Sequence, residues 1–257
     1  MAWKKLPHPE KAFAYTAAAL KKNWARLHRG DCEPLPDDAK VLEAWRCYHA
    51  GDFGKAVELG LACGMPGYTV ANKAAGIYAN YLETDDAHKL ALLLEAAQRC
   101  ETQQKAAPDC ANAWYLHAYT LGRYSQGISV GKALAQGLGG KIKSSLTRAL
   151  ELEPKHADAH IALGTYHAEV IDKVGSLVGG LTYGAKKSTG VEHFETALTL
   201  NPDSAIARIE FANALVIMFG GSRMKDAERL YQEAAICEPM DAMERLDVNL
   251  AKAELED

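Results

Sequence analysis

The residues with the most obvious chemical potential lie between positions 156 and 167. His156, Asp158 and His160, with His167 seven residues further on, carry the nitrogen and oxygen atoms that divalent metals prefer. His156 and Asp158 fall in a predicted turn that leads into a helix, where a polar side chain more often caps the helix. We therefore predict no metal site, and we expect the remaining histidines to pack singly on helices or lie on the surface.

Two Gly-Lys pairs suggest a phosphate-binding loop at first sight. Gly131-Lys132 and Gly139-Gly140-Lys141 both lack the Ser or Thr that follows the lysine in such loops, and both follow helical sequence, not a strand. The chain has no Gly-x-Ser-x-Gly motif and no acids in a recognisable catalytic spacing. We expect a protein that is not an enzyme and that holds no cofactor.

The composition is that of an ordinary globular protein. The 257 residues carry a formal net charge of -4, 48% are hydrophobic and 24% are charged, which excludes collagen-like, disordered and nucleic-acid-coating classes. Ala and Leu recur throughout and favour helices over sheets. The six cysteines form no CxxC pair, so unpaired thiols are expected.

No targeting or membrane-spanning segment is evident. There is no run of 18 or more apolar residues. The apolar stretch 12–20 is followed at once by Lys21 and Lys22, unlike the end of a signal peptide. We expect a cytoplasmic protein without a transmembrane segment, although a chain whose leader had been removed would look the same.

The chain contains an internal repeat. Residues 146–154, 194–202 and 231–239 each begin with a bulky side chain, carry Ala three positions later and end in Pro. After the proline the chain enters a new helix with small residues and reaches Leu163-Gly164 or Phe211-Ala212. Self-similar helical units of this kind predict stacked helical hairpins.

This pattern resembles the tetratricopeptide repeat (TPR). Trp114 and Ala118 match its first aromatic and small positions, and Leu163 and Gly164 match its Leu-Gly pair, although His160 replaces an aromatic residue. Ala227, Tyr231, Ala234 and Pro239 complete the last second helix. The resemblance implies an all-α fold, a TPR-like α-α superhelix built as a solenoid of antiparallel hairpins.

The expected organisation is one helical-repeat domain over residues 1–257. It has an N-terminal helix and linker at 1–36, degenerate repeats at 37–107, clear TPR-like repeats at 108–239 and a capping helix at 240–257.

Two central repeats are longer than the standard 34 residues. The repeat-ending prolines at 108, 154, 202 and 239 are spaced by 46, 48 and 37 residues. The surplus falls at 122–140 and 174–190, which hold eleven of the 21 glycines. If it lengthened both helices of each hairpin equally, each helix would gain about six residues, roughly 9 Å.

Basic residues gather around the same insertions. The segments 110–150 and 173–191 carry eight Lys or Arg and no Asp or Glu, which leaves -12 for the rest of the chain. We predict a basic protrusion, with these lysines: Lys132, Lys141, Lys143, Lys173, Lys186 and Lys187. Either the two hairpins simply pack together with the lysines in solvent, or the protrusion docks an acidic partner, a phosphate headgroup or an anionic ligand.

The layout with lengthened first helices is similar to that of the T component of tripartite periplasmic transporters and of the regulator of microtubule dynamics family. That resemblance implies a scaffold that binds a ligand or partner. The TPR resemblance further implies that the first helices line a concave groove. The corresponding residues are Lys73, Ile77, Asn80, Tyr81, Asn112, Tyr115, Tyr119, Arg123, Asp158, Ile161, Thr165, Glu169, Ile209 and Asn213.

Three interpretations follow. The first is a non-catalytic scaffold that binds a protein or peptide in this groove, with an acidic partner among the options and no preference for nucleic acid. The alternative is an accessory protein that binds a small molecule or anion in a pocket between residues 120–140 and 168–190. The third is a membrane contact by the Gly-rich tips. Self-association stays open.

Overall fold

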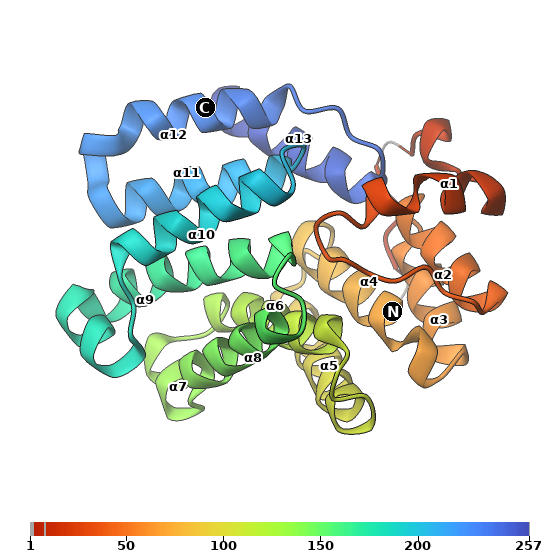
Figure 1. Ribbon diagram of the computed structural model, residues 1–257, viewed down its shortest axis with the longest axis horizontal. Helices are drawn as coiled ribbons and strands as arrows, with labels where there is room; N and C mark the ends of the chain where they lie inside the picture. The colour runs from red at the N-terminus through yellow and green to blue at the C-terminus, as the bar shows by residue number, and fades with distance from the viewer. Residues whose placement is uncertain (1–2, 8, 257) are drawn as a thin grey trace.

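The computed structural model describes residues 3–7 and 9–256, and in them it contains helices and no strands (Figure 1). The helices are α1 (Ala17–Leu27), α2 (Ala39–His49), α3 (Phe53–Ala62), α4 (Tyr68–Tyr81), α5 (Asp86–Ala106), α6 (Ala111–Gln126), α7 (Val130–Ala135), α8 (Leu138–Leu152), α9 (Ala157–Tyr183), α10 (Lys187–Leu200), α11 (Ala205–Phe219), α12 (Met224–Ala235) and α13 (Ala242–Glu256). The predicted all-α, TPR-like fold class is confirmed.

The helices pair in sequence order into antiparallel hairpins: α2 with α3, α4 with α5, α6 with α8, α9 with α10, and α11 with α12. Side-chain oxygens of Asp38, Asp52, Asp85 and Ser204 accept hydrogen bonds from the first turns that follow them and so fix where helices begin. The repeated small residues permit close crossings. A Cβ on Gly164 would come within 2.5 Å of the fully buried Phe194 ring.

The surplus residues are not shared equally between the helices of the two lengthened hairpins. In the first hairpin they form a separate short helix, α7, between α6 and α8. In the second they all extend the first helix, because α9 runs to Tyr183 and α10 begins at Lys187. The backbone of α9 breaks at Gly175, whose φ of +80° is readily adopted only by glycine. We call residues 176–183 beyond this break the outer tip.

One stretch, residues 205–235, is long and apolar enough to cross a membrane by length and composition alone. In the structure the 3-10 turn Gly220–Arg223 divides it into α11 and α12, which pack against each other. Each is shorter than the roughly 20 residues that a spanning helix needs. We therefore assign this stretch to the core of the last repeat.

The N-terminal segment and α13 join the two ends of the solenoid (Figure 1). Arg26 donates to Glu244 at 2.6 Å, and the Tyr15 hydroxyl donates to the backbone oxygen of Met240 at 2.7 Å. Behind these contacts lies a buried polar cluster that we call the terminal junction. Its members are His28, Asp31, His49, Lys73 and Asp241.

Candidate functional site

A cavity of about 430 Å³ opens between the two lengthened hairpins and continues into the concave side of the solenoid. Its walls come from α6, α7, α8 and α9, and its inner end is lined by residues of α4, α11 and α13. A volume of 300–1,000 Å³ is typical of pockets for small ligands. The cavity lies where the alternative interpretation of the sequence required one, and it is the candidate binding site.

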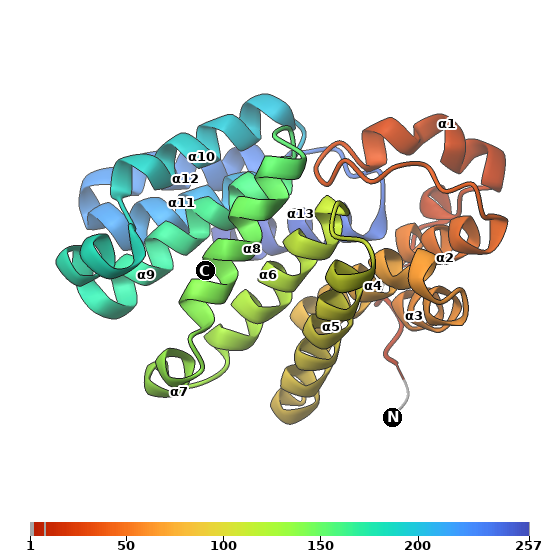
Figure 2. The ribbon, with the colours of Figure 1, turned by 60° about the horizontal axis from the view of Figure 1, so that its bottom comes forward.

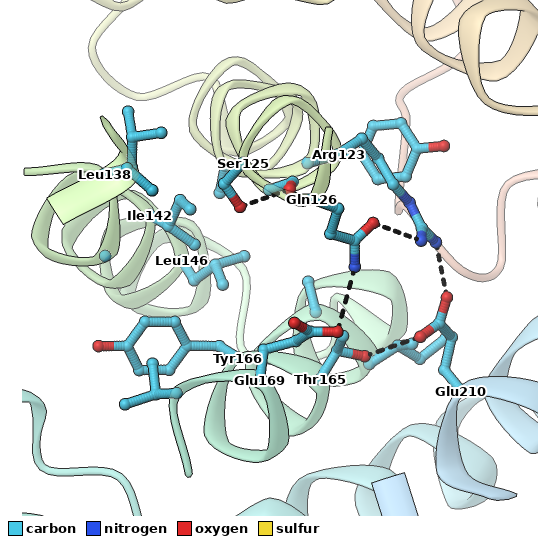
Figure 3. A pocket seen from close by; sticks show the side chains of 18 of the residues that line it. Arg123, Ser125, Gln126, Leu138, Ile142, Leu146, Thr165, Tyr166, Glu169 and Glu210 are labelled. Carbon is cyan, nitrogen blue, oxygen red and sulfur yellow. Dashed lines mark hydrogen bonds and ion pairs between the residues drawn. The ribbon is translucent and has the colours of Figure 1, made fainter. Parts of the chain in front are cut away.

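The outer part of the pocket is apolar. Figure 3 shows Leu138, Ile142 and Leu146 pointing into it from α8. Further apolar side chains line it from α7 and its flank, from α9 and from the outer tip: Ile128, Val130, Ala133, Leu134, Val170, Val174 and Tyr183. These side chains come largely from the two insertions, so the insertions build the site.

Tyr183 and Lys143 hold the two insertions together. A Cβ on Gly139 would lie 3.1 Å from the Tyr183 ring, so the absence of a side chain there lets the ring approach α8. The Lys143 ammonium donates to the backbone oxygen of Tyr183 at 2.7 Å. The apolar walls are therefore attached to each other across the insertions.

The inner part of the pocket is polar and centres on a buried ion pair. The Arg123 guanidinium donates to Glu210 at 2.6 Å and lies over the Tyr119 ring, 5.6 Å from its centroid. Burial acts to lower the pKa of Arg123, but the negative charge of Glu210 outweighs it and the pKa is raised. Arg123 is thus a fixed, neutralised cation.

Side chains of α6 and α9 complete this network (Figure 3). Gln126 accepts from Arg123 at 3.2 Å and donates to Glu169 at 3.4 Å, and the Thr165 hydroxyl donates to Glu210 at 3.2 Å. The network ties the first helices of three successive repeats together at the boundary between the apolar and polar parts of the pocket.

Two carboxyl groups lie at the innermost end. Asp247 accepts from the Tyr81 hydroxyl, and burial raises its pKa well above the usual value. Burial raises the pKa of Asp158 to about 6, against the lowering effect of the Lys73 charge. Within the described residues no donor is hydrogen-bonded to the Asp158 carboxylate.

The N-terminal segment fills part of the predicted groove. Asn112 is buried because it donates to the backbone oxygen of Asp31 at 3.0 Å and to Glu33 at 2.6 Å. The backbone amide of Asp158 donates to the oxygen of Gly30 at 2.9 Å. The N-terminal segment therefore covers the concave face at Asn112 and Asp158, two of the positions predicted to line the groove.

Ten of the fourteen predicted groove residues line the pocket, and they are Lys73, Ile77, Tyr81, Tyr115, Tyr119, Arg123, Asp158, Ile161, Thr165 and Glu169. The other four do not. Asn112 lies under the N-terminal segment, Ile209 is a core residue, and the exposed Asn213 accepts from the Tyr231 hydroxyl at 2.6 Å. Asn80 is half-buried outside the pocket.

The predicted basic residues do not form a uniform free surface. Besides Lys143, Lys173 pairs with Asp172 at 2.8 Å and Lys187 donates to the backbone oxygen of Met218. Lys132, Lys141 and Lys186 are exposed. The outer tip also exposes apolar side chains, since Leu177 is 76% and Leu181 is 82% exposed.

Several pocket residues were not predicted from the sequence. Glu210 follows Ile206 by one helical turn on the same face, so its place in the repeat could have revealed it. Asp247 and Met243 come from α13, whose return to the pocket has no signal in the repeat pattern.

The histidines near position 158 have structural partners. His156 caps α9 by accepting from the Ala159 amide at 3.0 Å, and its other ring nitrogen lies 2.9 Å from the Asn112 side-chain oxygen. His160 lies 2.9 Å from His193 through their Nδ1 atoms. Across residues 3–7 and 9–256 no group of three or more His, Cys, Asp or Glu is placed to hold a metal ion.

Comparisons with known proteins agree with this architecture. Residues 68–176 match the family model described as Regulator of microtubule dynamics protein 1-3. The solved structure of a thermophilic TPR protein from Thermus thermophilus superposes with a TM-score of 0.58, over 83% of this chain and 97% of that one, at 17% sequence identity. No curated protein matches. The antiparallel hairpins, their order along the chain and this structural match together show that the chain is a TPR-like helical-repeat protein.

Proposed function

We propose that this protein is a non-catalytic scaffold that binds an elongated, mainly apolar small molecule in the pocket between its two lengthened hairpins. The observation that carries this proposal is the largely apolar pocket of about 430 Å³ that the two insertions build. Burial of an apolar chain there removes it from water, which supplies the driving force for binding. The polar inner end adds orientation, as a few placed polar groups do in most ligand pockets.

A long peptide laid along the concave face fits less well. The N-terminal segment occupies that face at Asn112 and Asp158, and Lys73 is held by Asp31. A peptide would have to displace these buried contacts. An anionic ligand is also disfavoured, because the positive charges of Arg123 and Lys73 are already neutralised by Glu210 and Asp31.

A protein partner remains a second candidate, at a different place. TPR-like folds are typical of protein-interaction scaffolds, and the outer tip exposes Leu177 and Leu181, with the exposed Lys186 following in the sequence. Exposed apolar side chains of this size commonly mark interaction surfaces. Such a partner would contact the outside of the pocket wall, and an acidic one would be favoured by Lys132, Lys141 and Lys186. A cytoplasmic location stays a prediction.

The pocket assignment can be tested with 1-decanol, an uncharged ten-carbon chain, by isothermal titration calorimetry. Ala133 lines the pocket, whereas Ala135 on the same short helix is exposed and lies outside it. We expect wild type and Ala135→Phe to bind decanol alike and Ala133→Phe to bind at least tenfold more weakly, because its ring fills the cavity. Equal binding by both variants, or no binding by wild type, would refute the proposal.

A further inference from the structure

Every cation that lines the pocket already has an anionic partner in the protein. Lys73 pairs with Asp31, Arg123 with Glu210 at 2.6 Å, and Lys173 with Asp172 and Glu169. The lining also contains Asp247, which accepts from the Tyr81 hydroxyl, and Asp158, which shares the nearby Lys73 charge with Asp31 and forms no ion pair of its own. The described part of the pocket therefore holds an excess of carboxyl groups over cations.

Asp158 is the carboxylate in this set that remains open to a ligand. Asp247 is occupied by the Tyr81 hydroxyl, and its raised pKa favours the neutral form. The Asp158 side chain lines the pocket, is partly exposed to it, and lies against Gly30. With a pKa of about 6, Asp158 is mainly charged at pH 7.

The Tyr115 ring lies close to this carboxylate: burial raises the pKa of Tyr115, and the negative charge of Asp158 is the next cause. Tyr115 and Tyr119 both line the pocket, with ring centroids 6.2 Å apart. The Arg123 guanidinium already lies over the Tyr119 ring, so of the two rings Tyr115 is the one available to a ligand. A carboxylate beside a tyrosine ring in a partly dry pocket is an environment that stabilises an ammonium group.

From these contacts we propose that Asp158, with Tyr115, binds a cationic nitrogen at the polar end of the ligand, so that the ligand class is an alkylammonium amphiphile. This inference rests on the proposed function, because the apolar chain of the ligand occupies the outer pocket. Apolar side chains of α7, α8 and α9 line the outer part of the pocket, which favours the chain of a small amphiphile over the lysine of a partner protein.

Three probes with the same ten-carbon chain separate chain binding from charge recognition: decyltrimethylammonium, 1-decanol and decyl sulfate, each titrated below its critical micelle concentration. We expect decyltrimethylammonium to bind about tenfold tighter than decanol, and decyl sulfate to bind more weakly than both. If no probe binds, the proposed function fails. If decanol binds but decyltrimethylammonium binds no tighter, or decyl sulfate binds best, only the inference about the cation fails.

Two variants test the role of Asp158. Asp158→Asn keeps the shape and removes the charge, so it should abolish the preference for decyltrimethylammonium while decanol binding persists. Glu195→Gln removes one negative charge from an exposed position on α10 outside the pocket, so it is the control and should keep the preference. An Asp158→Asn protein that retained the preference would overturn the assignment.

Gly30→Ala tests the geometry without changing charge. A Cβ at position 30 would come within 2.3 Å of the Asp158 Oδ1 atom, so the carboxylate has to move. We expect the preference for decyltrimethylammonium over decanol to fall several-fold, while the affinity for decanol is retained. A leucine-lysine peptide that displaced decyltrimethylammonium with equal affinity would overturn the assignment to a small amphiphile.

The preference for decyltrimethylammonium over decanol should also depend on pH. The groups facing Asp158 are Asp31, Cys32, Tyr48, Lys73, Tyr115, Glu244 and Asp247. As the pH falls from 7 to 5 through the Asp158 pKa of about 6, the carboxylate is protonated and the preference should shrink several-fold. A preference that stayed constant from pH 7 to 5 would contradict the role of Asp158.

Discussion

The terminal junction and the outer tip differ in which side chains they bury: the junction buries polar groups, whereas the outer tip exposes apolar ones. At the junction, the polar groups of His28, Asp31 and Lys73 are buried and bonded to one another. At the outer tip, apolar side chains such as Leu177 and Leu181 are left in solvent. Buried polar groups that bond to one another hold the fold in one arrangement, whereas exposed apolar groups contribute nothing to the stability of the isolated chain. The junction is therefore structural, and the tip and pocket are the places to look for function.

The largest effect should come from breaking the junction. Asp31 accepts from both Lys73 and His28, so Asp31→Ala leaves two buried polar groups without their partner. We expect a loss of about 3–5 kcal/mol in the free energy of unfolding, measured by urea denaturation followed by circular dichroism.

Asp203→Ala is the control for this loss. Asp203 pairs with Arg29 at 2.7 Å, but its side chain is 47% exposed. It should cost no more than about 1 kcal/mol. If the two substitutions cost the same, the contrast between a structural junction and a solvated surface is wrong.

A change in pH should alter the free energy of unfolding by a smaller amount. Burial lowers the pKa of His28 to about 4, against the raising effect of Asp31. Because the unfolded side chain titrates near 6.5, it takes up a proton that the folded one refuses, so stability falls as the pH drops from 6.5 to 4. Asp31, whose pKa is held well below 3.8 by Lys73 and His28 against the effect of burial, adds a loss only at lower pH.

Urea denaturation at pH 7, 5.5 and 4.5 measures this dependence. In His28→Asn, the loss in the free energy of unfolding between pH 7 and 4.5 should be smaller than in wild type by up to about 3 kcal/mol. His156, whose pKa burial also lowers to about 4, should preserve part of the slope in the variant. A variant with the same slope as wild type would show that His28 is not the titrating group.

The smallest effect on stability should come from the outer tip. The double substitution Leu177→Ser and Leu181→Ser removes apolar groups that are already in solvent, so the free energy of unfolding should change by less than about 0.5 kcal/mol. If the tip binds a protein partner, recovery of that partner in a pull-down should nevertheless drop. Decanol binding in the pocket should stay unchanged, since neither residue lines it.

The sequence predicted the repeated hairpins because their determinants are local. Gly164 against Phe194 and the Ala residues of the second helices recur at fixed spacing, and each packs against its neighbour in sequence. The groove positions on the first helices followed from the same register, which is why residues such as Tyr115 and Ile161 do line the pocket.

The contributions from the two ends of the chain could not be predicted in this way. The contact of Gly30 with Asp158, and the return of Asp247 to the pocket, join residues far apart in sequence and leave no periodic signal. The shape of the second insertion depends on the backbone at Gly175, and its glycine content alone does not say which glycine adopts a positive φ.

The contact between α13 and the N-terminal segment has a mechanical consequence. A TPR-type solenoid whose ends are free can lengthen or coil like a spring, because each repeat contacts only its neighbours. Here Arg26 and Glu244 join the first and last helices, so the stack has no free end to extend. The insertions that wall the pocket, α7 and the far end of α9, lie at the side of the molecule away from α1–α3 and so away from this contact (Figure 2).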